Sequence, residues 1–409
     1  MNMRKAWGPL ACGCLSAVFT AFGCTADKVV SPPREAGVEL GGTPGLLGYD
    51  ASEGGRGATG KTPPSDANDL GDAASSPFAE CSALKGNELI ACGEYIVKHI
   101  DACGDCHSPI DKTTGRPSQN PALFLTGNPS VADLDAADDQ VGNIPAPNLT
   151  LLAGNGWTAK DLRSAILDGA RSKERGGGLF PIMPYATLHN MARQDADAIV
   201  AYLLSLPPTG HQMAGRDPLP ATIDPSLLPI PAFSASNIPD PAPNLPHVED
   251  ARRGKYLAAE LGLCMDCHTP RDPTMQLDAS KLFAGGETFP LPQPFGVVTA
   301  LNITPATNGI HTWDAENVKN LILTGLDDRG VAICPPMPAG PDGAFGGMTP
   351  NDALAIGYYI TSLPSVVNPA DGTAFNRCVP PPPPPPPKDA GVKPGVPDAA
   401  VTHPDGSTP

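Results

Sequence analysis

Positively charged residues are scarce in this chain. Its 409 residues include 27 lysines and arginines against 43 aspartates and glutamates, which gives a formal net charge of −16. An acidic surface argues against binding to the phosphates of nucleic acids and against electrostatic attraction to anionic lipid. No glycine-rich phosphate loop, Ser–His–Asp set or paired-carboxylate pattern stands out either. The sequence therefore points away from nucleic-acid binding and from these common kinds of catalytic site.

A long apolar run is also missing. The stretch over 6–22 follows two basic residues and is interrupted by glycine and cysteine. It is too short and too broken to span a membrane, so it predicts a secretory signal. The signal ends in TAFGC, which resembles a bacterial lipobox and predicts lipidation of Cys24, with plain secretion and cleavage nearby as the alternative. Thr25 follows Cys24, and by resemblance to Gram-negative lipoproteins this implies an exported protein on the periplasmic face of the outer membrane.

Proline and glycine, by contrast, are abundant, with 51 and 44 residues. This content is near the range in which low-complexity segments are expected, so the folded part should be much shorter than the chain. Two segments lie between the stretches rich in these residues and are predicted to be domains. The predicted order is a signal peptide with lipobox (1–24), a disordered tether (25–80), domain 1 (81–208), a proline-rich linker (209–246), domain 2 (247–379) and a polyproline tail (380–409).

Both predicted domains contain Cys-x-x-Cys-His, at 103–107 and at 264–268. This spacing is typical of covalent haem c, because each thiol adds to a porphyrin vinyl group and the histidine then lies beneath the iron. Half of a zinc site or a redox dithiol would share the Cys-x-x-Cys part. Zinc would need a second ligand pair nearby, and redox dithiols usually occur in a βαβ context, so two haems are the better interpretation. The predicted attachment residues are Cys103, Cys106, Cys264 and Cys267, and the predicted proximal ligands are His107 and His268.

The two domains repeat each other along the sequence. Gly93 and Gly254 precede their motifs by the same distance, and Asn148–Thr150 finds its counterpart in Asn302–Thr304. Each copy is expected to form three helices, and the two small glycines would let the first and last helices cross closely. The prediction is an all-α fold of two tandem domains, with helices over 88–101, 158–169 and 195–206 in the first copy and over 250–261, 314–325 and 349–363 in the second.

Each copy also has a methionine between prolines before its last helix. Met183 stands in the sequence PIMPY and Met337 in PPMP. Prolines stiffen a loop and help to hold a weak thioether donor at bonding distance, so both methionines are predicted to be distal iron ligands. The competing ligand candidates are His189 and Met191 in the first copy and Met348 in the second.

Four cysteines remain once the signal, the lipid anchor and the haem motifs are set aside. An even number of cysteines in an oxidising compartment predicts disulfides. The simplest arrangement has one bridge per domain, although several pairings are possible and the sequence does not choose among them. The pairs in this arrangement are Cys81–Cys92 and Cys334–Cys378.

The residues around the haem motifs carry a resemblance to a known family. Segments 93–107, 148–150 and 183–185, with their second-copy equivalents, resemble class I cytochrome c domains. They look most like the tandem domains in cytochrome subunits of bacterial membrane-bound alcohol and aldehyde dehydrogenases. The resemblance implies a dihaem carrier of single electrons with no substrate turnover of its own, held at the membrane by its lipid anchor only. It also implies redox protein partners, such as a periplasmic dehydrogenase or a terminal oxidase.

This chain departs from that family in two ways. Those subunits commonly carry three haem domains, whereas this chain has two. In the second copy Ala339 replaces the aromatic residue that follows Met-Pro, and Cys334 stands beside the ligand loop, which leaves the environment of the second haem open. A rival interpretation is a dihaem cytochrome c peroxidase, which would need an open distal face on one haem, and two Met-Pro loops argue against it. A third is a non-catalytic electron-transfer subunit of a periplasmic dehydrogenase.

Overall fold

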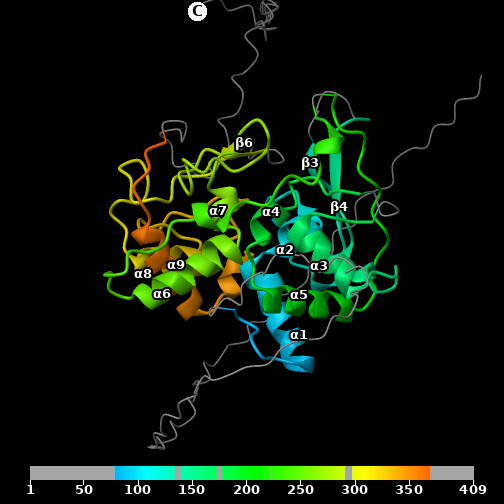
Figure 1. Cartoon of the computed structure of the whole chain (residues 1–409), viewed down its shortest axis with the longest axis horizontal. Coiled ribbons are helices and arrows are strands. Elements are labelled where there is room, and N and C mark those ends of the chain that lie inside the picture. Colours follow the sequence, from blue (N-terminus) through cyan, green and yellow to red (C-terminus); the bar gives the residue numbers. More distant parts are fainter. Residues whose placement is uncertain (1–78, 134–139, 173–176, 222, 291–296, 369–409) are drawn as a thin grey trace, which may run out of the picture. The chain divides into compact units, whose positions relative to one another are not determined.

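Helices make up most of the regular structure in this computed structural model (Figure 1). The structure describes residues 79–133, 140–172, 177–221, 223–290 and 297–368. All of them belong to one unit, Ala67–Pro409, while the other unit, Met1–Asp66, lies outside the described residues. The predicted signal peptide, Cys24, nearly all of the tether, Cys378 and the polyproline tail are likewise outside them. Within the described ranges, no helix has the length and apolar character needed to cross a membrane.

The helices of the second copy occur along the chain in the same order as their counterparts in the first copy. The first copy contains α1 (Gly86–Tyr95), α2 (Cys103–His107), α3 (Ala159–Asp168), α4 (Tyr185–Leu188) and α5 (Arg193–Ser205). The second contains α6 (Val248–Lys255), α7 (Cys264–Cys267), α8 (Ala315–Thr324) and α9 (Pro350–Ser362). A π-helical turn continues the first helix of each copy, at Ile96–Ile100 and Tyr256–Glu260. The three helices predicted for each copy are confirmed, and the π-helical turns and the short helices at the haem motifs are additions to them.

Local caps explain where the middle helices begin and end. At the start of α3, the Thr158 side chain accepts from the Asp161 N–H while the Asp161 carboxylate accepts from the Thr158 N–H. This capping box satisfies two donors that a helix leaves free at its first turn. Gly169 ends α3 in the left-handed region, with φ 61°. In the second copy Asp314 caps α8 in the same way, and Gly325 ends it with φ 71°.

Three short antiparallel strand pairs accompany the helices, and the sequence did not predict them. They are β1 (Ile110–Asp111) with β2 (Arg116–Pro117), β3 (Asn128–Asp133) with β4 (Asn143–Ala146), and β5 (Thr288–Pro290) with β6 (Val297–Thr299). Ile110 pairs with Pro117 and Thr288 with Thr299, whereas the β3–β4 register shifts between Asn128 and Ala132. The β3–β4 pair of the first copy and the β5–β6 pair of the second each lie between the haem motif and the Asn-x-Thr segment.

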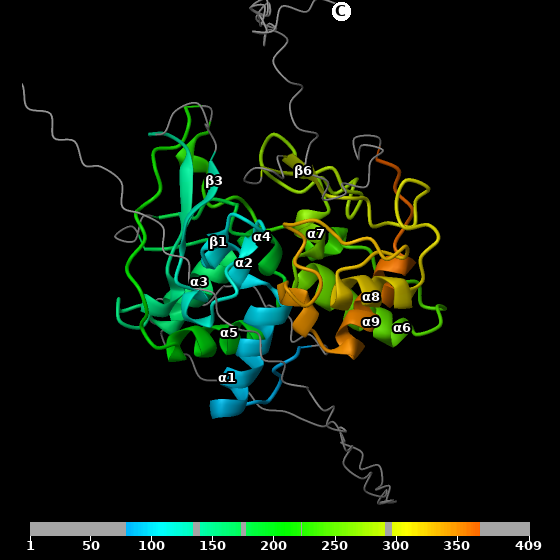
Figure 2. The same cartoon turned by 180° about the vertical axis from the view of Figure 1, so that it is seen from behind.

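The first and last helices of each copy cross at a glycine, as predicted (Figure 2). A Cβ atom on Gly93 of α1 would lie 2.0 Å from the backbone oxygen of Ala198 in α5. A Cβ atom on Gly254 of α6 would lie 1.9 Å from the backbone oxygen of Ala355 in α9. Such distances are far inside van der Waals contact, so each crossing depends on the missing side chain.

The two copies are joined by reciprocal tyrosine contacts. The Tyr95 hydroxyl at the end of α1 donates to Asp352 and accepts from the N–H of Thr349, at the start of α9. In the other direction, the Tyr256 hydroxyl donates to Asp195 in the first turn of α5 and accepts from the Ala192 N–H before it. Each copy therefore supplies a tyrosine hydroxyl that binds the start of the other copy's last helix. One buried apolar cluster spans both copies.

The proline-rich linker also packs against both copies. The Phe233 N–H donates to the carbonyl of Ala186 in α4, at 2.9 Å. The hydroxyl of Tyr359 in α9 donates to the Pro239 carbonyl at 3.1 Å. The linker is therefore a packed segment of the described fold and has contacts of its own with each copy.

We predict that Gly93→Ala lowers the free energy of unfolding by about 3 kcal/mol, because the added methyl group forces α1 and α5 apart. Chemical denaturation followed by circular dichroism measures this change. Gly154→Ala is the matched control, since its Cβ would make an ordinary contact with the Leu151 backbone oxygen at 3.8 Å. A change within about 0.5 kcal/mol is expected for it, and an equal effect of both variants would contradict the close-crossing argument.

Candidate haem site

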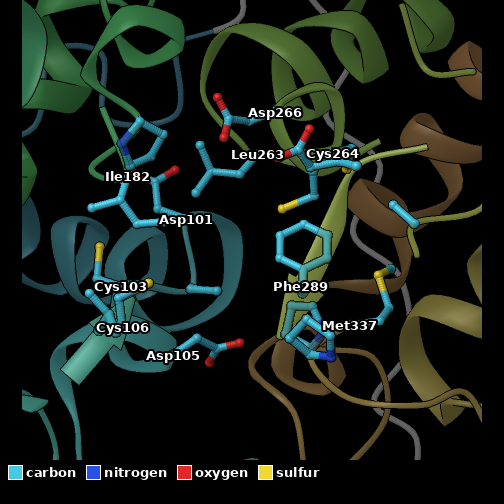
Figure 3. Close-up of a pocket in the computed structure, with 18 of the residues that line it drawn as sticks. Asp101, Cys103, Asp105, Cys106, Ile182, Leu263, Cys264, Asp266, Phe289 and Met337 are labelled. Atoms are coloured by element: carbon cyan, nitrogen blue, oxygen red, sulfur yellow. The ribbon is translucent and has the colours of Figure 1, made fainter. Parts of the chain in front are cut away.

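Both Cys-x-x-Cys-His motifs face one cavity. Its volume is about 2590 Å³, and it is lined by residues of the two copies. Figure 3 shows Cys103 and Cys106 on one side and Cys264 and Met337 on the other, with Phe289 between Cys264 and Met337. The structure thus brings together residues that are far apart in the sequence. All of the predicted attachment and ligand residues line this cavity: Cys103, Cys106, His107, Met183, Cys264, Cys267, His268 and Met337.

The short helices α2 and α7 present the four motif thiols. None of the four is in a disulfide within the described part of the chain. Cys106 and Cys267 open into the cavity, and the protein surrounds them on their other sides. Burial raises the pKa of Cys106 and of Cys264 to about 12, and it raises the pKa of the other two thiols as well. The four thiols are therefore favoured in the protonated form.

Each motif histidine is oriented by a backbone carbonyl. The Nδ1 atom of His107 lies 2.9 Å from the Pro147 oxygen, and that of His268 lies 2.7 Å from the Leu301 oxygen. With Nδ1–H as the donor, Nε2 is left as the metal-binding atom. Burial lowers the pKa of both imidazoles, and the hydrogen bond to the carbonyl partly offsets this. Both rings are therefore favoured in the neutral form that can coordinate iron.

The repeated Asn-x-Thr segments fix these carbonyls. In the first copy the Asn148 side-chain oxygen accepts from the N–H and the hydroxyl of Thr150, at 2.9 and 2.7 Å. Its amide nitrogen donates to the carbonyls of Thr209 and His211, at 2.7 and 3.1 Å. Asn302 makes the same bonds to Thr304 in the second copy. In each copy, the asparagine directly follows the residue whose carbonyl binds the motif histidine. The hydrogen bonds of the asparagine therefore fix the position of that carbonyl.

The predicted distal methionines lie in loops at the same cavity, and the competing residues are placed differently. Met183 and Met337 are half-buried and line the cavity. Met191 is 1% exposed and packs in the core, while His189 is exposed beside the end of α3. Met348 is buried and also lines the cavity. Met265, which stands inside the second motif, is fully buried in the core cluster.

The cysteines outside the motifs are in disulfides where the structure describes them. Cys81 and Cys92 are bonded to each other, with their Cα atoms 5.8 Å apart. This bridge joins the segment before α1 to α1 itself. Cys334 is also disulfide-bonded. Because Cys378 lies outside the described residues, the Cys334–Cys378 pairing stays a prediction.

Several site residues were not predicted. The Asp101 side chain is buried at the cavity, and its Oδ1 atom has no hydrogen-bond partner among the described residues. Burial raises the pKa of this carboxyl well above its usual range. Asp266 accepts from Thr187 of the other copy and from Arg271, each at 2.8 Å. The sequence held one signal for Asp266. Both haem motifs have an aspartate directly before the second cysteine, which is Asp105 in the first motif and Asp266 in the second.

These residues fit haem c. Each copy supplies two neutral thiols, an imidazole held so that Nε2 is available, and a thioether, all at a cavity lined by many apolar side chains. Thiols suit covalent attachment to the porphyrin, and imidazole with thioether is a known axial pair for haem iron. Within the described ranges, no group of three or more histidine, cysteine, aspartate or glutamate side chains is placed to bind a bare metal ion.

Comparisons with known proteins give relatives of one kind. No protein-family model matches the chain. The fructose dehydrogenase cytochrome subunit of Gluconobacter japonicus is 28% identical over 288 residues, 68% of this chain and 53% of that protein. A diheme cytochrome c-type protein of Cereibacter sphaeroides is 32% identical over 230 residues, 55% of this chain and 69% of the relative. The gluconate 2-dehydrogenase cytochrome c subunit of Pantoea cypripedii is 25% identical over 312 residues, 70% of this chain and 62% of that subunit. The chain thus spans about half of the first of these relatives.

We predict that Asn148→Ala lowers the free energy of unfolding by about 2 to 4 kcal/mol, because buried partners lose their hydrogen bonds. Chemical denaturation measures the loss. Asn237→Ala, at an exposed position of the linker, is the control and should change stability by less than about 0.5 kcal/mol. A neutral Asn148→Ala variant would show that the segment does not hold the Pro147 carbonyl.

Proposed function

Since this chain belongs to the c-type cytochrome family that includes the dihaem protein of Cereibacter sphaeroides, we propose that it binds two haems c and carries single electrons between other proteins. Covalent haem c and electron transfer follow from the family. The count of two rests on the two complete motifs of this chain. When bound, the haem iron supplies the redox chemistry by changing between its ferric and ferrous forms.

The observation that carries the proposal is the repeated geometry at one cavity. In both copies the motif histidine makes the same bond from Nδ1 to a backbone carbonyl, and in both a Met-Pro loop lines the same cavity. We assign His107 and His268 as proximal ligands and Met183 and Met337 as distal ligands. A thioether on the distal side closes the iron to peroxide and favours a carrier over a peroxidase.

We assign residues 81–208 and 247–379 to two cytochrome c domains, joined by the linker over 209–246. The support is the same order of helices in both copies, with an equivalent glycine crossing in each. Cys103 and Cys106 attach one haem, and Cys264 and Cys267 attach the other. The shared cavity keeps the two haems within one protein interior, which favours transfer of an electron from one to the other.

The partner and the location are part of the proposal. Two of the relatives are named cytochrome subunits of dehydrogenases, which supports a dehydrogenase as the electron donor. Attachment of haem c, the Cys81–Cys92 disulfide and the secretory signal together support export to the periplasmic side of a bacterial membrane. We further propose lipidation at Cys24, with attachment to the outer membrane, and the Cys334–Cys378 bridge.

Haem counting tests the proposal. Mass spectrometry of the denatured chain, produced in a host that matures cytochromes c, should show the mass of two haems added. Cys103→Ala with Cys106→Ala should leave one, and so should Cys264→Ala with Cys267→Ala. Peroxide turnover at the level of free haem is expected for the intact protein. A chain with no covalent haem, or one with rapid peroxide turnover, would contradict the electron-carrier function.

Met183→Leu tests the distal ligand, because it removes the thioether while nearly conserving volume. We expect the first haem to stay attached, its reduction potential to fall, and the chain to bind about one equivalent of carbon monoxide. Redox titration and the Met–iron charge-transfer band measure these changes. The matched control is Met191→Leu, a buried methionine of the same copy, which should leave the band and the potential unchanged. Retention of the full band in Met183→Leu would exclude Met183 as a ligand.

A further inference from the structure

The two Met-Pro loops are supported in different ways. In the first copy the Tyr185 ring packs against Gly169, where a Cβ would come within 2.6 Å of the ring. The hydroxyl of Tyr185 accepts from the Ile230 N–H of the linker at 2.9 Å and donates to the Leu179 carbonyl at 3.2 Å. A tyrosine and the linker therefore hold the loop that contains Met183.

The second loop has no such ring, because Ala339 stands at the position of Tyr185. In the second copy, the backbone itself fills the space that the tyrosine ring takes in the first, and Gly340 lies directly against Gly325 at the end of α8. The linker bond to a tyrosine hydroxyl has no equivalent in a loop with Ala339. Within the second copy, the Gly340 N–H donates to the Ile322 carbonyl at 2.9 Å and the Phe345 N–H donates to the Pro338 carbonyl at 2.8 Å, so backbone bonds hold the part of the loop after Met337.

A side chain of the first copy binds the part of the loop that leads up to Met337. Arg116, in strand β2, donates from Nη1 to the carbonyl of Met337 at 3.0 Å and from Nη2 to the carbonyl of Ile333 at 3.3 Å. These two carbonyls bracket the segment that contains Cys334 and the two prolines before Met337. The planar guanidinium presents two donors in a fixed geometry, which a lysine ammonium does not. One side chain thus fixes both ends of the loop.

Neighbouring contacts place Arg116 at the meeting point of the two haem motifs. Gln119, next along the same hairpin region, donates to the carbonyl of Asp342 at 3.1 Å. Arg116 is half-buried and lines the same cavity as the motif residues.

We propose that Arg116 is a positioning residue for the second haem site, and that this arginine of the first copy keeps Met337 on the iron of the second. The inference rests on the proposed haem ligation. It assigns to Arg116 the supporting role that Tyr185 and the linker have in the first copy. Met337 ligation therefore depends on a residue outside its own domain.

Arg116→Gln and Arg116→Lys test this role in the full-length protein with both haems attached. Both variants should lose about half of the Met–iron charge-transfer band and bind about one equivalent of carbon monoxide per chain, because one of two irons loses its thioether. Arg116→Lys keeps the charge but not the paired donors, so it separates positioning from a simple charge effect. Arg163→Gln is the matched control, a half-buried arginine of the same copy that pairs with Asp197, and it should keep the full band.

A double-variant comparison identifies the haem concerned. In a Met337→Leu background, Arg116→Gln should cause no further loss of the band, whereas in a Met183→Leu background it should abolish what remains. Additive loss in the Met337→Leu background would overturn the proposal, as would an unchanged band in Arg116→Gln and Arg116→Lys. Absence of any Met–iron band in the wild-type protein would instead contradict methionine ligation itself. Failure of the Arg116 proposal and failure of the proposed methionine ligation therefore give different results.

Discussion

The reciprocal tyrosine contacts fix the relation between the two copies, and the site depends on that relation. Tyr95 and Tyr256 each bind an aspartate and a backbone N–H at the start of the other copy's last helix. Hydrogen bonds to charged groups contribute about 1.5 to 3 kcal/mol each when both partners are in place. Because a π-helical turn leads from each tyrosine toward the haem motif, these contacts also determine where both motifs lie. π-Helical turns are rare and often occur at functional sites.

The local parts of this fold were predictable, for reasons that lie in short stretches of sequence. The Thr158 and Asp161 pair predicted the start of α3, and Gly169 predicted its end. The repeated Gly93 and Gly254 predicted the helix crossings, because only the absence of a side chain permits such an approach. The haem motifs were equally recognisable, since the two cysteines and the histidine of each lie within five consecutive residues.

The contacts between copies were not predictable from the sequence. Tyr95 and Asp352 are separated by 257 positions, and Asp352 looks like an ordinary acidic residue in the first turn of a helix. The groups that orient the histidines are backbone carbonyls, which carry no side-chain signature. Asn148 was visible as a repeated residue, but its role in holding one of those carbonyls depends on bonds to Thr209 and His211 in the linker. Arg116 gave no signal because its partners are backbone carbonyls 217 and 221 positions away in the second copy.

Because the linker packs against both copies, neither copy is a complete structural unit without it. The contacts of Ile230 and Phe233 join it to α4, and the contact of Pro239 joins it to α9. A boundary drawn by sequence similarity would assign these residues to neither copy, yet Ile230 binds the tyrosine that follows Met183 and Pro184. Recombination or gene truncation at this boundary would therefore not release two interchangeable units. The structural unit is the pair of copies together with the linker that contacts both of them.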